Sequence, residues 1–301
     1  MKNFILAAKG FCMGAADVVP GVSGGTMAFI LGIYAQLLAA IRSFDTIWLK
    51  HIVKLEFKQV IQRPHFPFLI PLGIGILCAI IFFTRIIPLP TLLYTHADLV
   101  YGLFFGLIIG SIMTLLPEGG RFDRIFAFFI SVGMALGWFV VTLVPMNTPD
   151  ATWFIFLSGV LAISAMILPG ISGSFILLIL KKYDTILNAI GHFRLEILIP
   201  FGLGAIVGLT MFSRFLSWLL SHAYRETLIT IVGVLIGSLW VIYPFQSRKY
   251  ETIHGKQKLI DSTPYLPNEI TQHVLLVLLM VFIGLATVFF IHWLNKRLKH
   301  T

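Results

Sequence analysis

The sequence predicts an all-α polytopic membrane protein built from two inverted-topology repeats, each a re-entrant helical hairpin followed by three transmembrane helices. Three observations lead to this fold class. Of 301 residues, 58% are hydrophobic and only 12% are charged, about half of the ~25% charged fraction typical of soluble domains. Apolar stretches recur along the whole chain, and a Pro-Gly-x-Ser-Gly segment occurs twice. The chain is therefore expected to be one integral membrane unit.

The chain contains an internal repeat, a pattern that determines the fold as a whole. Three pairs of segments match in the same order: residues 20–25 (PGVSGG) with 169–174 (PGISGS), residues 70–75 (IPLGIG) with 199–204 (IPFGLG), and residues 106–117 with 233–244. Chance does not readily produce three matches in the same order. They predict a first repeat over residues 1–147 and a second over residues 148–301.

The stretches that carry the paired motif, residues 10–40 and 153–180, are each too short for two spans and are broken near the middle by Pro and Gly. Helix breakers at membrane depth are tolerated where the backbone lines a protein cavity. Each stretch is therefore predicted to form a re-entrant helix–loop–helix hairpin. Six other apolar stretches approach the ~20 residues needed to cross a bilayer and are predicted to span it: residues 68–87, 98–117, 124–144, 197–220, 226–244 and 272–294.

Basic residues predict the orientation. Lys2 and Lys9 precede the first hairpin and the basic residues of 42–63 follow it, so both flanks favour the cytoplasm. Three spans then end the first repeat outside, which inverts the second repeat and returns the C-terminus to the cytoplasm. Both termini are thus predicted to be cytoplasmic. This orientation places some basic residues outside, against the usual bias: Lys181, Lys182 and those of 248–258.

Inverted repeats with broken helices near the midplane are a recurrent plan of secondary transporters. Glycine lets backbone amides approach a ligand, serine adds a hydroxyl donor, and the start of a helix favours an anion such as phosphate. The predicted phosphate-binding residues of the two loops are Ser23, Gly24, Gly25, Thr26, Ser172, Gly173 and Ser174. Those predicted to shape the loops are Pro20, Gly21, Pro169 and Gly170. The alternative is that the glycines only permit tight helix packing.

Three charged residues are candidates for a part in transport. Arg85 and Arg214 occupy matching places at the ends of apolar spans, where a central arginine costs about 2.5–3.5 kcal/mol unless it reaches the headgroups or pairs. Each either extends to the lipid headgroups or binds an anionic substrate from its own side. Asp17 lies just before the first loop and has Met166 at the matching position. It is a candidate proton carrier, with helix capping or hydrogen bonding as the alternative.

No metal ion or cofactor is expected. The nine histidines show no ligand spacing, and Cys12 and Cys78 lie in apolar sequence without a disulfide or metal-ligand pattern. The net charge is +9, but the basic residues lie between the apolar stretches. They therefore indicate topology and contacts with membrane lipids and not a nucleic-acid partner. The sequence leaves open whether the protein forms a homodimer.

Residues 14–26 (GAADVVPGVSGGT), with their echo in residues 168–174 (LPGISGS), resemble the bacterial and archaeal polyprenyl-phosphate transporter family of PopT type. The resemblance covers essentially the whole chain. It implies a transporter, not an enzyme, that moves undecaprenyl phosphate from the outer to the inner leaflet of the bacterial cytoplasmic (inner) membrane for reuse in cell-envelope synthesis. The phosphate carries about −1.5 to −2 charges and would meet a large desolvation penalty in the hydrocarbon core. A path of amides, hydroxyls and arginines would lower that penalty.

Two other functions fit the same residues. An intramembrane polyprenyl phosphatase could use similar loops, but hydrolysis requires a nucleophile or general base beside the phosphate. The loops offer Ser23, Ser172 and Asp17, with no His or Glu close in sequence. A small-anion channel or exporter could use the loops as a filter. Phosphate release and transport of a soluble anion are the assays that distinguish these alternatives.

Overall fold

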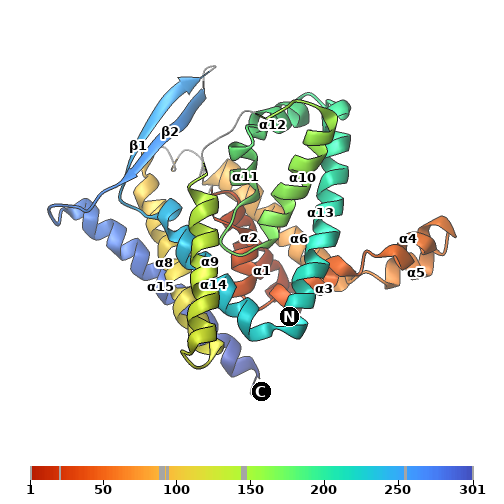
Figure 1. Cartoon of the computed structure of the whole chain (residues 1–301), viewed down its shortest axis with the longest axis horizontal. Coiled ribbons are helices and arrows are strands. Elements are labelled where there is room, and N and C mark those ends of the chain that lie inside the picture. The colour runs from red at the N-terminus through yellow and green to blue at the C-terminus, as the bar shows by residue number, and fades with distance from the viewer. Residues whose placement is uncertain are drawn as a thin grey trace.

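The computed structural model of the protein describes residues 2–19, 22–87, 92, 95–143, 148–253 and 256–299. Within these residues, five helices are long and apolar enough to cross a membrane: Ala97–Gly119, Arg124–Val141, Leu195–His222, Tyr224–Ile242 and Gln272–Trp293. Two shorter apolar helices, Phe66–Ile81 and Thr152–Ile167, accompany them. The protein is therefore a mostly helical, multi-pass membrane protein (Figure 1).

In the first half of the chain, all the regular elements among the described residues are helices. Its elements are α1 (Lys2–Asp17), α2 (Gly24–Ile30), α3 (Tyr34–Arg42), α4 (Thr46–Val53), α5 (Phe57–Gln62), α6 (Phe66–Ile81), the π-helix η1 (Phe82–Ile86), α8 (Ala97–Leu115), the 3-10 helix η2 (Leu116–Gly119) and α9 (Arg124–Val141). Asp123 begins α9, because its carboxylate accepts the Phe126 N–H at 2.8 Å and satisfies one of the amides left free at a helix start.

The second half contains the exception to an all-α fold. Its elements are α10 (Thr152–Ile167), α11 (Gly173–Ile179), α12 (Tyr183–Gly191), α13 (Leu195–His222), α14 (Tyr224–Ile242), the strands β1 (Gln246–Ile253) and β2 (Lys256–Pro264), and α15 (Gln272–Lys299). The two strands pair in antiparallel fashion, with Gln246 opposite Pro264. This hairpin projects from the helices at the top of Figure 1 and corrects the strictly all-α prediction.

Five of the six predicted spans coincide with long apolar helices. The sixth predicted span, residues 68–87, falls on the shorter apolar helix α6 and on η1, which follows it. Here α6 is 16 residues long and passes directly into η1, so the stretch is divided between two helix types. The span predicted over residues 124–144 ends as a helix at Val141, and residue 144 lies outside the described residues.

Both predicted hairpins contain a helix, a loop and a second helix, but their bounds differ from the prediction. The first begins at Lys2, not at residue 10, and the second continues through α12 to Gly191. In each, a residue with positive φ separates the two short helices after the loop: Gly32 at 68° and Lys181 at 51°. Glycine adopts this conformation without strain, whereas a lysine does so at a cost.

The first half packs α1 tightly against α6. A Cβ added at Gly10 would lie 2.1 Å from the Leu72 carbonyl oxygen, and one added at Gly75 would lie 1.9 Å from that of Ala7. Neither side chain would fit without moving backbone. Small residues thus allow the two helix backbones into direct contact, as they do in many membrane helix pairs.

The second half packs α10 against α13 through matching positions. A Cβ at Gly159 would lie 2.3 Å from the Phe201 carbonyl oxygen, and one at Gly204 would lie 1.9 Å from that of Phe156. When the paired loops are aligned, Gly159 and Phe156 fall on Gly10 and Ala7 of the first half. When the paired IPxGxG segments are aligned, Phe201 and Gly204 fall on Leu72 and Gly75. The two halves therefore make the same helix contacts.

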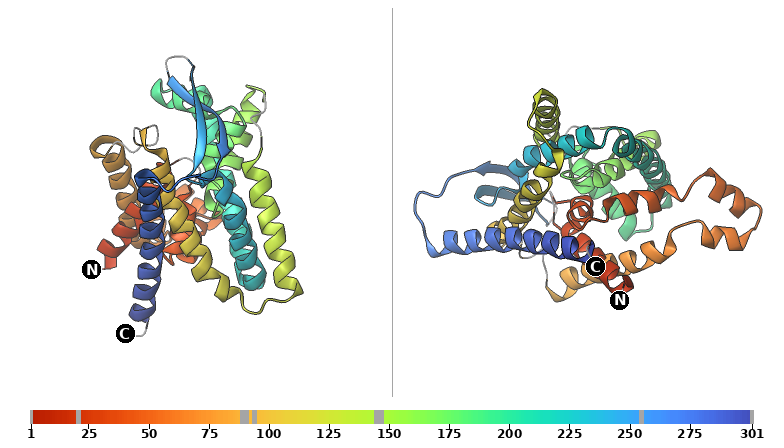
Figure 2. Two further views of the ribbon diagram at one scale, coloured as in Figure 1. Left: turned by 90° about the vertical axis from the view of Figure 1, so that its left-hand side faces the viewer. Right: turned by 90° about the horizontal axis from the view of Figure 1, so that it is seen from below.

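The remaining long helices pair across the two halves. α8 packs on α15, and α14 packs on α9. The close approaches again match. In the pair of α8 and α15, Gly106 lies against the Val281 carbonyl and Gly284 against that of Leu103. In the pair of α9 and α14, Gly233 lies against the Ile130 carbonyl and Gly133 against that of Thr230. Each half thus contributes its third long helix to a pair with the other half, as the interleaved colours of Figure 2 show.

The largest hydrophobic core surrounds the first hairpin. It contains Met13 and Val19 from α1 and the loop, and Ile167, Leu235 and Val288 from the second half. Because the end of α1 and the start of α2 are buried in this core, residues of both halves cover the first loop. The fold therefore brings the two loops of the repeated motif together.

Candidate functional site

The first loop is held by side chains that bind its own backbone amides. Ser23 is the N-cap of α2, and its Oγ accepts the Gly25 N–H at 3.1 Å. The Asp17 carboxylate, at the end of α1, accepts the Gly24 N–H at 2.7 Å. Both amides belong to the start of a helix, where negative charge is stabilised. Asp17 therefore places a carboxylate where the sequence predicts a phosphate, and the helix-capping alternative for Asp17 is present in this structure.

Hydrogen bonds join the first loop to the second half. The Ser23 hydroxyl donates to the Met166 carbonyl at 3.0 Å, and the Gly170 N–H donates to Thr26 Oγ1 at 2.8 Å. The Tyr34 hydroxyl donates to the Ile167 carbonyl at 2.9 Å. The structure thus brings together residues of the two copies of the motif that are well over a hundred positions apart in the chain.

The glycines of the first loop are required by close approach. A Cβ at Gly24 would lie 2.5 Å from the Asp17 carboxylate, and one at Gly25 would lie 2.7 Å from the Met166 carbonyl oxygen. In this structure, protein groups fill the space that Cβ atoms would take. The distances therefore support tight packing as the role of these glycines as well as a phosphate-binding site. Any ligand at these amides must displace those groups.

The second loop lacks an acidic cap. Ser172 is the N-cap of α11 but makes no side-chain cap bond, and its hydroxyl lies 2.7 Å from that of Ser174. Gly170 has a φ of 94°, a left-handed conformation that favours glycine. Gly173 lies against the Ala162 carbonyl, 2.6 Å from where its Cβ would be. The two loops share their serines and differ in the residue that faces the helix start.

The candidate hydroxyls are buried. Ser23 is 2% exposed and Thr26 1%, Ser172 is also buried, and Ser174 is half-buried. Pro169 and Gly170 are buried beside them. Pro20 and Gly21, predicted to shape the first loop, lie outside the described residues. The site is therefore closed, and a headgroup can reach the hydroxyls only if the loops separate.

The two candidate arginines are not part of this cluster. Arg85 lies in η1 and Arg214 in α13, and both side chains are exposed. Within the described residues, neither makes a hydrogen bond or ion pair, to the loops or elsewhere. The structure leaves both side chains free on the surface of the helix bundle.

An apolar groove of about 920 Å³ lies beside the site and was not predicted from the sequence. Its walls come from α8, α9, α14 and the segment after β2, with Trp138, Trp240 and Tyr265 among the lining residues. The second loop touches Leu235 and Ser238 of α14, whereas the groove is lined by Gly237 and Trp240 of the same helix. One helix therefore separates the loop from the groove.

An ion pair between a buried lysine and an exposed aspartate was also not predicted. Lys182 is 2% exposed, and its Nζ donates to the Asp150 carboxylate at 2.5 Å and to the Thr148 carbonyl at 3.2 Å. A charged group at such a position requires a partner of opposite charge. Lys182 is one of the basic residues that ran against the predicted orientation. Its charge is matched by Asp150, so it does not act as a free topology signal.

No group of three or more His, Cys, Asp or Glu side chains suited to a metal ion occurs among the residues that the structure describes. In the same residues, Cys12 and Cys78 are free thiols. The site is thus built from amides, hydroxyls and one carboxylate.

Comparisons with known proteins agree on one family. The sequence model of the VCA0040-like family, described as undecaprenyl phosphate translocase-like, matches residues 13–260. A polyprenyl-phosphate transporter of Vibrio cholerae is 40% identical over 240 residues, covering 79% of this chain and 77% of that protein. A polyprenyl-phosphate transporter of Staphylococcus aureus is 35% identical over 257 residues, covering 78% of this chain and 84% of that protein. No solved structure matches.

These matches confirm the resemblance inferred from the repeated loops. Both relatives are named as transporters and not as enzymes, in agreement with the expectation for a lipid-carrier transporter. The family match includes the first loop and the second loop, and it covers most of the chain. The chain belongs to the undecaprenyl phosphate translocase-like family.

Proposed function

We propose that this protein transports polyprenyl phosphate, in the form of undecaprenyl phosphate, from the outer to the inner leaflet of the bacterial inner membrane. The phosphate passes between the two loops by alternating access, while the polyprenyl tail remains in an apolar environment. Both curated relatives carry the name of a polyprenyl-phosphate transporter. The direction of transport and the alternating-access mechanism are proposed here and are not part of those names.

The observation that carries the proposal is the pair of hydrogen bonds between the loops. Ser23 to the Met166 carbonyl and the Gly170 N–H to Thr26 join the two halves at the buried hydroxyls. A hydrogen bond of this kind contributes about 0.5–1.5 kcal/mol, and one to a charged group about 1.5–3 kcal/mol. A phosphate that takes over these donors can therefore offset the loss of the contacts that hold the loops closed.

Asp17 gives the proposed site a means of proton coupling. Its carboxylate occupies the Gly24 amide, so an ionised Asp17 and a phosphate would compete for the same donors and repel each other. Protonation of Asp17 removes that repulsion. Because Met166 stands at the matching position of the second half, only one of the two loops carries this group. This difference between the two loops sets the direction of transport at a site that is otherwise symmetric.

The matching helix contacts support the inverted repeat. α1 with α6 and α10 with α13 pack through equivalent glycines, and the third long helices are exchanged between the halves. We assign the two hairpins as re-entrant and the two termini as cytoplasmic, in accordance with the positive-inside rule. Exchanging the conformations of two such repeats opens one site alternately to the two sides of the membrane.

The apolar groove beside α14 is assigned to the polyprenyl tail. Its aromatic and aliphatic walls include no Lys or Arg to balance a phosphate charge, and an isoprenoid chain needs none. The headgroup would then lie at the loops, on the other face of the same helix. This arrangement separates the polar and apolar parts of the substrate by the width of one helix.

The test is reconstitution of the purified protein into vesicles with polyprenyl phosphate added to one leaflet. The expected result is faster appearance of the lipid in the other leaflet than in protein-free vesicles, without release of inorganic phosphate. Phosphate release from polyprenyl pyrophosphate would favour the phosphatase instead. Entry of a soluble anion without any polyprenyl lipid would favour the channel.

A further inference from the structure

A helical arm projects from the side of the bundle. It comprises residues 45–63, with α4, a turn and α5, and it connects α3 to α6. Figure 1 shows it extending sideways from the long helices, and the view from below in Figure 2 shows the same projection. The next helix, α6, exposes Ile70, Ile74 and Leu77, which face lipid in a membrane-spanning bundle. The arm therefore leads into a helix that faces lipid.

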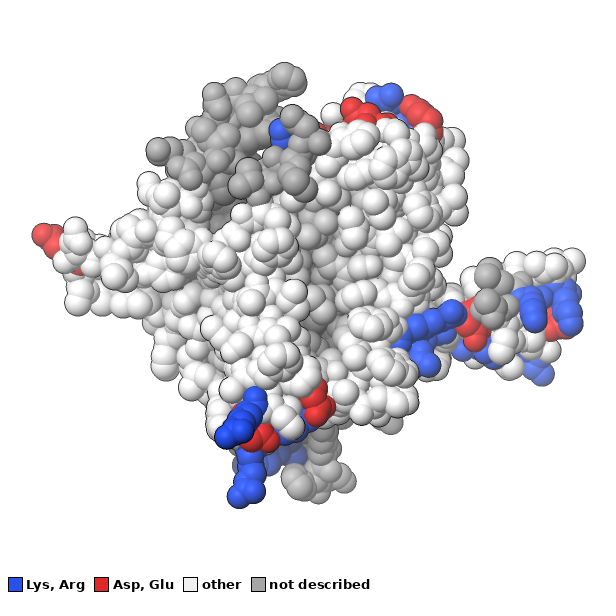
Figure 3. All heavy atoms as spheres, viewed as in Figure 1, with Lys and Arg blue, Asp and Glu red and all other residues white. Residues whose placement is uncertain are grey.

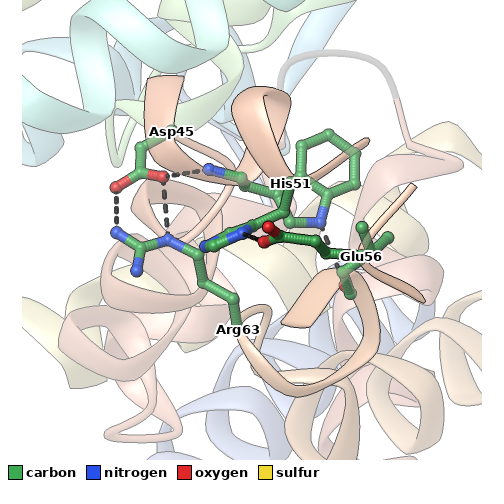
Figure 4. A network of polar contacts seen from close by, with 6 residues as sticks. Asp45, His51, Glu56 and Arg63 are labelled. Atoms are coloured by element: carbon green, nitrogen blue, oxygen red, sulfur yellow. Dashed lines mark hydrogen bonds and ion pairs between the residues drawn. The ribbon is translucent and has the colours of Figure 1, made fainter. Parts of the chain in front are cut away.

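The arm is closed into a fixed shape at its base. The Asp45 carboxylate accepts the Trp48 N–H at 2.9 Å and two bonds from Arg63, at 2.9 Å from Nε and 2.5 Å from Nη2 (Figure 4). The hydrogen bond from Arg63 holds the pKa of Asp45 well below its ordinary value, so the ion pair persists at neutral pH. The Trp48 indole N–H donates to the Val60 carbonyl at 3.0 Å.

The tip exposes apolar side chains. Val53 is 83% exposed, Leu55 69% and Phe57 68%. Leu55 has a φ of 55°, in a turn where glycine is the usual residue, and Leu55 and Glu56 donate their N–H groups to the Ile52 and His51 carbonyls. A strained turn thus presents an exposed leucine between the two helices of the arm. Clustered exposed apolar side chains indicate a contact surface.

The charges beside this tip are positive. Lys50, Lys54 and Lys58 are exposed and make no ion pair within the part of the chain that the structure describes. Both acids of the arm are already paired, Asp45 with Arg63 and Glu56 with His51. Figure 3 shows lysine and arginine side chains on the arm beside uncharged surface. The partner of the arm must therefore be both anionic and apolar.

We propose that the arm is an interfacial anchor that binds the anionic leaflet next to the bundle. Val53, Leu55 and Phe57 enter the boundary between headgroups and acyl chains, and the three lysines bind lipid phosphates. A basic amphipathic surface with apolar residues at its edge is typical of segments that lie in the membrane interface. A lipid surface fits better than an acidic protein, because the arm extends sideways from helices that are themselves embedded in lipid.

The test places a nitroxide label at the tip of the full-length protein, as Leu55→Cys in a Cys12→Ala, Cys78→Ser background. The protein is reconstituted into vesicles of phosphatidylethanolamine and phosphatidylglycerol. Collision with oxygen, which concentrates in lipid, is compared with collision with a water-soluble nickel complex. Gln59→Cys is the control, because it is exposed on α5 opposite the face of Phe57 and Ile61.

The expected result is an oxygen-to-nickel ratio severalfold higher at position 55 than at position 59. A ratio at position 55 as low as at position 59 would overturn the anchor and leave a water-exposed or protein-binding arm. Val53→Cys provides a second label site should Leu55→Cys fail to fold.

The lysines are tested by the triple change Lys50→Gln, Lys54→Gln, Lys58→Gln. The control is Arg121→Gln, Arg124→Gln, at and before the start of α9. The label at position 55 should move toward water in the triple variant and also in neutral phosphatidylcholine vesicles. It should stay in place in the control variant. An unchanged depth in both the triple variant and the neutral vesicles would contradict binding of anionic headgroups.

Discussion

Asp17 is the residue at which the two loops differ most in chemistry. We predict that Asp17→Asn abolishes the pH dependence of leaflet exchange, because an amide oxygen still accepts the Gly24 N–H but has no proton to gain or lose between about pH 5 and 8. The exchange rate is to be measured across this range in vesicles. The thermal stability of the variant should stay close to that of the wild type.

The matched control for this change is Asp123→Asn. Asp123 also accepts a helix-start amide, that of Phe126 at 2.8 Å, but far from the loops in sequence. This bond lowers the pKa of Asp123 below its ordinary value, so the carboxylate stays ionised above about pH 5 and contributes no pH dependence there. An unchanged pH profile in Asp17→Asn would make Asp17 a structural cap alone.

Arg85 and Arg214 are exposed and lie apart from the loops. If they hold the headgroup as it enters and leaves, Arg85→Ala and Arg214→Ala will each slow exchange about tenfold, since losing a bond to a charged group costs about 1.5–3 kcal/mol. Membrane insertion should be unaffected. Arg124→Ala, at the exposed start of α9, is the control. Wild-type exchange in both variants would assign these arginines to lipid headgroups.

At the scale of helices, the glycine contacts make a paired prediction within α6. Gly75→Ala will destabilise the protein by about 1–3 kcal/mol, the usual cost of overpacking, because its Cβ would lie 1.9 Å from the Ala7 carbonyl oxygen. Gly73→Ala, two residues earlier, meets nothing within 4 Å and should have little effect. Thermal unfolding in detergent measures both. Equal stability of the two variants would contradict the close packing of α1 on α6.

The long apolar helices and the two broken segments were predictable from the sequence, since hydrophobic length and Pro-Gly breaks act locally. The division of residues 68–87 into α6 and η1 was not, because Phe82–Ile86 carries no Gly or Pro to mark it. The arm was not predicted either. Its two helices are too short to form alone and depend on the pairing of Asp45 with Arg63 across 18 positions.

The site residues were predictable only in part. Repetition identified Ser23 and Ser172, and the structure adds that Ser23 contacts the second half through the Met166 carbonyl. A backbone acceptor leaves no mark in a sequence, so neither this bond nor that of Tyr34 to the Ile167 carbonyl could be foreseen. The groove was also missed, because its walls come from four separate segments.

For the whole molecule, the pairing of helices limits where a transport motion can occur. Four helix pairs meet through backbone contacts at glycine: α1 with α6, α10 with α13, α8 with α15 and α9 with α14. Close-packed pairs of this kind move as units. The loops, in contrast, are joined by single side-chain hydrogen bonds. Alternating access would therefore separate the pairs from one another at the loops and preserve the contacts within each pair.

The central claim is that the phosphate crosses between the two loops. The most direct measurement is the rate of polyprenyl phosphate exchange in vesicles for the double variant Ser23→Ala, Ser172→Ala, compared with wild type and with Ser111→Ala. Ser111 is a buried serine that donates to the Leu107 carbonyl within its own helix. The account predicts at least about a tenfold loss in the double variant, because two donors to a charged group are removed, and wild-type exchange in Ser111→Ala. Wild-type exchange by a folded double variant would contradict it.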